Sequence, residues 1–175
     1  MFKKIGIAAV VLVAAIFAYA ATKPDTFHIE RTASIKAPPE KIFALINDFH
    51  QWGAWSPYEK KDPEMQRTHS GPASGKGAVY EWDGDHNIGK GRMEITDASP
   101  PSKIVIKLDF MKPFEAHNIA EFTLEAKGDA TNVTWAMYGR NSYIGKVMSI
   151  VFDMDEMVGK DFEIGLANLK AAAGA

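Results

Sequence analysis

Residues 143–172, YIGKVMSIVFDMDEMVGKDFEIGLANLKAA, decide how the rest of the chain is interpreted. At about 100° per residue, one side of a helix over this segment collects nine apolar side chains, and charged or polar residues fill the other side. The apolar stripe consists of Ile144, Val147, Met148, Val151, Met154, Val158, Phe162, Leu166 and Leu169. This spacing predicts one long C-terminal helix, from Tyr143 to Ala172, that lies on a sheet with its outer side in solvent.

Asp155 projects into the middle of this apolar stripe. A carboxyl group on a buried face must be paired, hydrogen-bonded or protonated. If it faces a cavity, Asp155 orients a polar group of a ligand or acts as a general acid or base, with Tyr80 or Tyr138 as a proton-donating partner. The alternative is a structural carboxylate bonded to one of four polar side chains: Arg31, Arg92, Tyr80 or Tyr138. Ion pairs of this kind also perturb acids that have no function.

Upstream of the helix, short runs alternate apolar and polar side chains, as strands do. Phe27 to Lys36 is the first strand, and further strands follow between Met65 and Tyr138, separated by turns rich in Gly, Pro, Ser and Asp. Pro38-Pro39 begins a short helix after the first strand, and Phe49 to Trp55 suggests a second. About six antiparallel strands before the long helix predict an α+β fold, in which the helix covers a curved sheet.

One helix covers a large curved sheet incompletely, so we expect a hollow between the two layers. Six side chains are candidates for contact with a ligand there: Trp82, Met93, Phe110, Trp135, Met148 and Asp155. Large aromatic and Met side chains are also typical of ordinary core packing, so the pattern leaves both roles open. The segment from Trp52 to Trp55 is either a lid over the hollow or a packed corner.

Composition excludes several classes of function. The 175 residues suffice for one domain, and a net charge of −2 with interspersed basic residues gives no sign of a nucleic-acid-binding surface. The absence of cysteine excludes disulfides, thiol catalysis and zinc sites with cysteine ligands. The five histidines are dispersed, without the HxH or HExxH spacing of metal sites. We therefore expect no metal and no cofactor.

The chain opens with Lys3 and Lys4, followed by an uncharged, largely apolar run from Ile5 to Ala21. As a helix this run is about 26 Å long, close to the roughly 30 Å of a bilayer's hydrocarbon core. A single-pass membrane anchor fits, and the run is longer than the apolar part of most signal peptides. A cleaved signal peptide is the competing interpretation, supported by Ala18-Tyr19-Ala20.

Both interpretations place the folded part outside the cytoplasm, because the two lysines stay inside. The localisation expected is therefore the cell membrane, with the domain on the extracytoplasmic, periplasmic side, or a soluble periplasmic or secreted protein after cleavage. The predicted organisation is an anchor or signal over residues 1–22, a linker over 23–26 and one domain over 27–172.

Several motifs resemble those of the START-like, or SRPBCC, superfamily, and in particular its polyketide cyclase/dehydrase branch. They are RTASIKAPPEKIFAL at 31–45, Asp48-Phe49, the Trp52, Trp55, Ser56 and Pro57 cluster, GKGA at 75–78 before YEW at 80–82, and GLANLK at 165–170. The resemblance covers nearly the whole domain. It implies a helix-grip fold, in which a strongly curved antiparallel sheet surrounds the C-terminal helix and leaves a deep cavity.

The resemblance is weakly specific for function, because the superfamily includes lipid carriers, hormone receptors, aromatic cyclases and chaperone activators. The function we expect first is a membrane-anchored, non-enzymatic domain that binds a lipid or another hydrophobic small molecule. A cyclase or dehydratase that uses Asp155 as its acid or base is the second hypothesis. A protein-interaction domain of the cell envelope is the third, and it predicts a contiguous exposed apolar patch.

Overall fold

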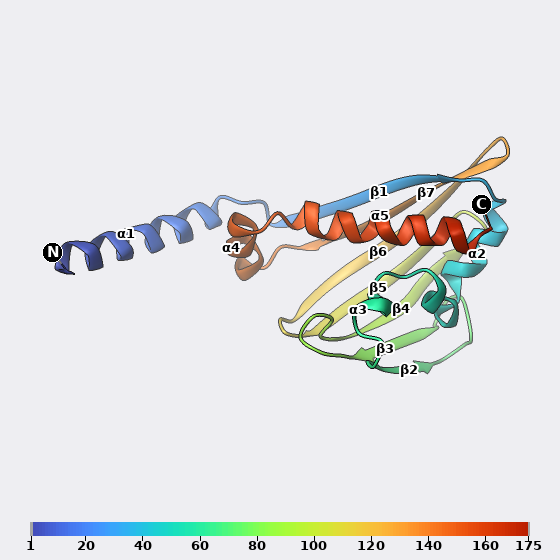
Figure 1. Ribbon diagram of the computed structural model, residues 1–175, viewed down its shortest axis with the longest axis horizontal. Helices are drawn as coiled ribbons and strands as arrows, with labels where there is room; N and C mark the ends of the chain where they lie inside the picture. The colour runs from blue at the N-terminus through green and yellow to red at the C-terminus, as the bar shows by residue number, and fades with distance from the viewer. Residues whose placement is uncertain (1, 175) are drawn as a thin grey trace.

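A seven-stranded antiparallel sheet forms one layer of the domain (Figure 1). The computed structural model describes residues 2–174. The strands are β1 (Thr26–Ile35), β2 (Gln66–Ser70), β3 (Val79–Asp83), β4 (Lys90–Ser99), β5 (Lys103–Lys112), β6 (Ala116–Lys127) and β7 (Ala130–Arg140). Their order is β1-β7-β6-β5-β4-β3-β2, so β2 to β7 form a meander and β1 pairs with the last strand. The predicted α+β architecture is confirmed.

Three short helices connect β1 to β2: α2 (Pro39–Asn47), the 3-10 helix η1 (Phe49–Ala54) and the single turn α3 (Tyr58–Lys61). Trp52 Nε1 donates a hydrogen bond to the Ile46 carbonyl at 2.9 Å, and Trp55 Nε1 donates one to the Leu45 carbonyl at 3.0 Å. Both indoles are buried, and they fix η1 against the end of α2. The segment from Trp52 to Trp55 is therefore a packed corner.

The prediction of one C-terminal helix is wrong, because the chain forms two: α4 (Tyr143–Val151) and α5 (Met154–Ala172). Phe152 has an extended backbone, and the Asp153 carboxylate accepts a hydrogen bond from the Glu156 backbone N–H at 3.0 Å. This bond caps the N-terminus of α5. Figure 1 shows α5 lying along the sheet, with α4 set apart beside α1 (Phe2–Ala21).

The second half of the predicted stripe does face the sheet. Phe162, Leu166 and Leu169 are buried, and the Phe162 ring stacks on Trp135 of β7 with centroids 4.1 Å apart. Gly165 allows this close approach, since a Cβ atom built on it lies 2.6 Å from the Trp135 ring. The contact between α5 and β7 is thus a stack of aromatic rings within a core that also contains many aliphatic side chains.

The helix α1 projects from the domain (Figure 1). Nearly all of its described side chains are exposed. Among residues 2–174, it is the helix whose length and apolar composition suffice to cross a membrane. Its last turns contact α4, where the Tyr143 hydroxyl donates a hydrogen bond to the Phe17 carbonyl at 2.7 Å.

Asp155 does not face the core, contrary to the prediction. Its side chain is 60% exposed and pairs with Arg31, whose Nη2 lies 3.0 Å from Asp155 Oδ2. Arg31 Nε also donates to Glu163 at 3.0 Å. The hydrogen bond from Arg31 lowers the pKa of Asp155. The structural interpretation of this carboxylate is therefore correct: it ties the start of α5 to β1, the edge strand of the sheet.

We expect Gly165→Leu to destabilise the domain by about 1–3 kcal/mol, because a larger side chain displaces Trp135 from its stack on Phe162. The control is Ala167→Leu, which adds a Leu to the exposed side of the same helix. Urea unfolding of the full chain in detergent, followed by circular dichroism, measures both variants. Equal stability of the two variants would contradict the close approach of α5 to the sheet.

Asp155→Asn should lower stability at pH 7, because it removes the ion pair with Arg31. The folded-state pKa of Asp155 lies below the ordinary value of 3.8, so this contribution is present above that pH and disappears as pH falls through the lowered pKa. The matched control, Glu156→Gln, changes a neighbouring carboxylate in the same helical turn. Unfolding curves between pH 7 and pH 2 should separate the two variants at neutral pH, with a difference that shrinks as pH falls below 3.8. A constant difference would exclude the ion pair as its cause.

Candidate ligand cavity

A cavity of ≈ 220 Å³ lies between α5, α3 and the inner face of the sheet. Its walls come from segments far apart in the sequence, and most of the lining side chains are apolar. The lining consists of Trp52, Ser56, Tyr58, Glu59, Lys61, Met65, Tyr80, Trp82, Asn87, Ile88, Met93, Leu108, Phe110, Ala120, Trp135, Met137, Val158, Asp161 and Phe162. The hollow expected from incomplete coverage of the sheet is therefore present.

Four of the six candidate residues line this cavity: Trp82, Met93, Phe110 and Trp135. Each lies on a different strand, β3, β4, β5 or β7. Because side chains alternate between the two faces of a strand, the sequence pattern predicted that all four face inward. Met148 and Asp155 lie elsewhere, on α4 and on the first turn of α5. Both are exposed: the break at Phe152 directs α4, with Met148, away from the sheet, and Asp155 pairs with Arg31 at the start of α5.

The polar part of the cavity is built around Glu59, which sequence reasoning missed. The Tyr80 hydroxyl donates a hydrogen bond to Glu59 Oε1 at 2.5 Å, and Arg67 Nε donates one to Glu59 Oε2 at 2.7 Å. Burial, together with the Glu59 carboxylate, raises the pKa of Tyr80 well above its usual value. Tyr80 is thus a neutral phenol that donates to a paired carboxylate, and Tyr80 and Glu59 both contribute to the cavity wall.

The expected partnership of Asp155 with Tyr80 or Tyr138 is not formed. Tyr80 donates to Glu59, and Tyr138 donates to Glu121 Oε2 at 3.1 Å. Asp155 instead receives its hydrogen bonds from Arg31. The structure therefore does not support the acid–base role predicted for Asp155, because neither tyrosine is bonded to its carboxylate.

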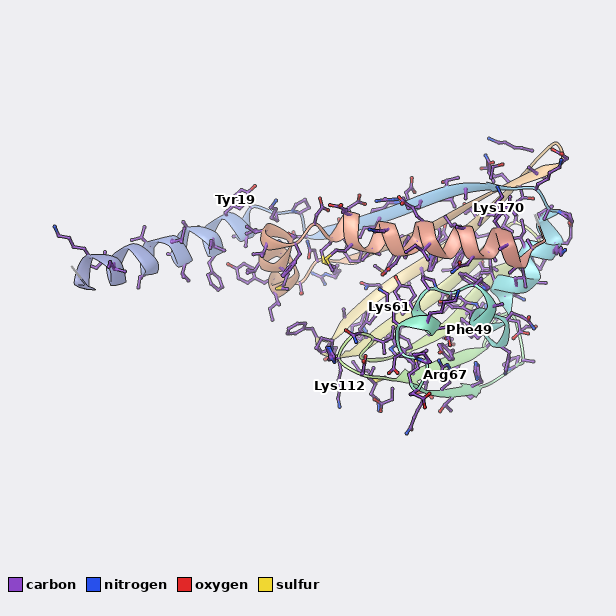
Figure 2. The ribbon with its side chains drawn as sticks, viewed as in Figure 1. Tyr19, Phe49, Lys61, Arg67, Lys112 and Lys170 are labelled. Carbon is purple, nitrogen blue, oxygen red and sulfur yellow. The ribbon has the colours of Figure 1, made fainter. Side chains whose placement is uncertain are left out.

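An ion pair joins two helices beside the cavity. Lys61 Nζ of α3 lies 2.6 Å from Asp161 Oδ2 of α5, and both residues contribute to the lining. Figure 2 labels Lys61 on α3. Tyr58 lies next to this pair, and burial raises the pKa of its hydroxyl. Because the pair connects α3 to α5, it stabilises the wall that these two helices form.

Trp135 contributes a buried donor to the same region. Its Nε1 atom is shielded from solvent and has no hydrogen-bond partner among the described residues. A buried N–H group without a partner costs about 1–3 kcal/mol. The cavity is therefore apolar with a few polar groups, the usual character of sites for small molecules.

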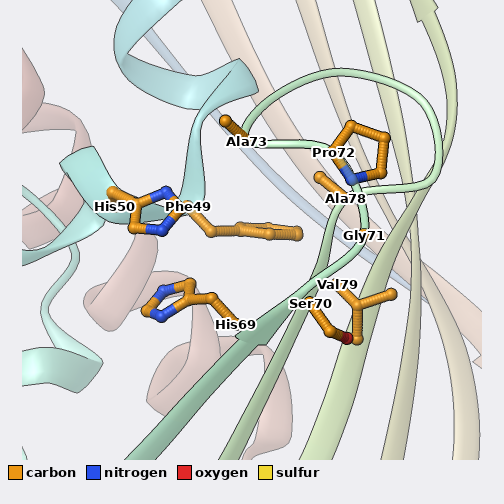
Figure 3. A pocket seen from close by; sticks show the side chains of 9 residues that line it. All are labelled: Phe49, His50, His69, Ser70, Gly71, Pro72, Ala73, Ala78 and Val79. Atoms are coloured by element: carbon orange, nitrogen blue, oxygen red, sulfur yellow. The ribbon is translucent and has the colours of Figure 1, made fainter.

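A second pocket, of ≈ 240 Å³, is lined by residues of η1, of β2 and of the connection from β2 to β3 (Figure 3). The rings of His50 and His69 stack there with centroids 4.2 Å apart, beside Phe49. Burial and the neighbouring His50 lower the pKa of His69. Asp48 binds the His50 ring at 2.8 Å, but among residues 2–174 no three metal-binding side chains gather into a metal site. We assign no ligand to this pocket.

The fold is shared with several solved structures. Protein CV1439 from Chromobacterium violaceum has 16% identity to the chain, with a TM-score of 0.60 and coverage of 87% of this chain and 99% of that one. A protein from Thermobifida fusca also has 16% identity, with a TM-score of 0.62 and coverage of 84% and 93%. The di-domain ARO/CYC BexL, from the BE-7585A biosynthetic pathway, has 14% identity, a TM-score of 0.62 and coverage of 99% and 59%. At these identities the likenesses show the fold, and the predicted helix-grip architecture is confirmed.

None of the curated proteins matches this sequence. A family model described as "Polyketide cyclase / dehydrase and lipid transport" matches residues 26–174, which extend from the first strand to the end of α5. The match spans most of the chain and agrees with the fold and with an apolar cavity beneath the C-terminal helix. The chain therefore belongs to the polyketide cyclase/dehydrase and lipid transport family.

Proposed function

We propose that this protein binds a small hydrophobic molecule in the cavity beneath α5 and is held at the outer surface of a membrane by α1. The observation that carries the proposal is the lining of the cavity, in which Trp82, Met93, Phe110 and Trp135 converge. Transfer of an apolar ligand from water into such a lining is favourable by about 25 cal/mol for each Å² of apolar surface that is buried.

The volume limits the size of the ligand. A dry protein cavity of about 150 Å³ already accommodates benzene. The ≈ 220 Å³ available here therefore suits a compact ring system or a segment of one acyl chain rather than a complete two-chain phospholipid. A polar end of the ligand has Tyr80 and Glu59 as neighbours.

The anchored location rests on α1. Its segment Lys4–Ala21 is apolar and long enough to span a bilayer, and few of its side chains are covered by the domain. Lys4 at its start favours a cytoplasmic N-terminus by the positive-inside rule, which leaves the domain on the extracytoplasmic side. Cleavage after Ala20 is the alternative, and the mass of the mature protein distinguishes the two.

Binding is tested by filling the cavity. Ala120 is buried on β6 and lines the cavity, so Ala120→Phe places a ring inside it. Ala44 is exposed on α2, which makes Ala44→Phe a matched control. Native mass spectrometry of the full chain, gently purified from its own host in mild detergent, should show a stoichiometric apolar adduct on the wild type and on Ala44→Phe.

Ala120→Phe should reduce the occupancy by about tenfold or more, because overpacking costs about 1–3 kcal/mol when the ligand remains. Lipid that surrounds α1 is unaffected by this substitution, so only a cavity ligand responds to it. An adduct of equal occupancy in all three proteins, or an empty wild type, would contradict the proposal.

A cyclase or dehydratase activity is the second candidate, and the Glu59–Tyr80 pair favours it. A carboxylate and a phenol in contact within an apolar cavity are suited to general acid–base chemistry. In this alternative Glu59 takes the role that the sequence suggested for Asp155, and the ligand is a substrate with a hydroxyl or carbonyl group.

Glu59→Gln separates binding from catalysis. If the protein only binds, the variant should carry the same adduct as the wild type, since Gln occupies nearly the same volume as Glu. If it dehydrates its ligand, the variant should accumulate a precursor that is heavier by one water molecule. Accurate mass of the extracted ligand decides between these outcomes, and an Arg67→Gln variant, which keeps Glu59, controls for the loss of the ion pair with Arg67.

A further inference from the structure

The helix α4 exposes an apolar face that no other described part of the chain covers. Ile144, Met148 and Val151 lie three and four residues apart, so they share one side of the helix. We call this surface, together with the residue that follows α4 and two near the start of α5, the α4 patch. It comprises Ile144, Met148, Val151, Phe152, Met154 and Met157, whose exposed fractions range from 39% to 69%. Exposed apolar surface of this extent marks an interaction site.

The position of α4 relative to α1 is fixed by specific contacts. The Tyr143 hydroxyl donates to the Phe17 carbonyl at 2.7 Å, and the two rings lie 6.0 Å apart. Lys146, which is buried, forms an ion pair with Asp25 in the connection between α1 and β1. These contacts hold α4 beside the last turns of α1.

This geometry sets the depth of α4 if α1 spans a bilayer. Phe17 lies four residues before the end of α1 at Ala21, which corresponds to about 6 Å along the helix axis. Interfacial helices bury their apolar faces about 5–10 Å into the boundary between headgroups and acyl chains. Tyr19 and Lys23, whose ammonium group lies 4.9 Å from the Tyr19 ring, are the residue types that mark this boundary. The α4 patch is therefore at the level of the membrane interface.

A second apolar element lies at the same end of the domain. Met111 is 46% exposed and Phe114 is 58% exposed, at the end of β5 and in the turn that leads to β6. Lys112 lies between them in sequence, and Figure 2 shows it at the end of the sheet that faces α1. A lysine between exposed apolar residues suits a surface of acyl chains and anionic headgroups.

We propose that α4 is an interfacial helix, whose apolar patch inserts into the outer leaflet of the bilayer crossed by α1, with the turn between β5 and β6 as a second contact. The inference rests on the anchoring role proposed above for α1. It assigns one binding partner, the lipid surface, to the exposed apolar residues. It also gives a reason for the different axes of α4 and α5.

The cavity is adjacent to this surface. Phe110 and Val158 line the cavity. The exposed Met111 is the next residue after Phe110, and the exposed Met157 is the residue before Val158.

The absence of native cysteine makes a direct test possible, because one engineered cysteine carries one fluorescent label. We would label four single-cysteine variants of the full chain, V11C, V151C, F114C and I164C, with an environment-sensitive dye. Val11 reports on α1, Val151 and Phe114 report on the two proposed contacts, and Ile164 is the control. Ile164 is an exposed apolar residue of α5 about 15 Å beyond the start of that helix.

The labelled proteins are reconstituted in vesicles of phosphatidylcholine and phosphatidylglycerol, with nitroxide-bearing lipids as quenchers. We expect loss of fluorescence at Val151 and Phe114, strongest with the nitroxide near the headgroup. Val11 should respond most to a nitroxide deep in the acyl chain, and Ile164 should keep its fluorescence.

Each alternative gives a different pattern. Quenching at Val11 without quenching at Val151 and Phe114 would overturn the docking surface and leave the anchor intact. Shielding of Val151 from aqueous iodide without lipid quenching would likewise overturn it, because a protein or a second copy of the chain then covers the patch. Equal quenching at Ile164 would show that the domain rests on another face. An unquenched Val11 would contradict the anchoring role itself, and with it the proposed location of the binding function.

Discussion

The hydrogen bond between the Asp153 carboxylate and the Glu156 backbone N–H divides the C-terminal segment into two helices with different environments. On one side of this cap, α5 turns Phe162, Leu166 and Leu169 onto the sheet and closes the cavity. On the other side, α4 is free to pack beside α1, which leaves its apolar face exposed. A single continuous helix would not allow both arrangements at once, because both segments would then share one axis.

The sheet and its inner face were predictable from the sequence, and the reason is the period of the strands. Trp82, Met93, Phe110 and Trp135 each occupy an inward position in an alternating run, so local pattern and tertiary position agree. The corner from Trp52 to Trp55 was left open between two alternatives. Its assignment depends on hydrogen bonds from the indoles to carbonyl groups, and residue types alone do not specify them.

The errors have two physical sources. The apolar spacing continues across Phe152 and Asp153, so periodicity alone joins α4 to α5 and places Met148 and Asp155 on the buried side. The pattern of Asp153 followed three residues later by Glu156 is typical of a helix N-terminus, and it was the available signal for the break. Glu59 had no such signal, because it lies on a single helical turn, and its role arises from contacts with Tyr80 and Arg67.

The pairing of β1 with β7 also constrains when the domain is able to form. Thr32 of β1 lies opposite Thr134 of β7, 102 residues later in the chain. Synthesis proceeds from the N-terminus, so the first strand is complete long before its only neighbour in the sheet exists. Contacts of such long sequence separation slow folding and prolong the exposure of unpaired strand edges. During biogenesis β1 is therefore the strand that waits longest for its partner, although it is the first strand after α1 in the sequence.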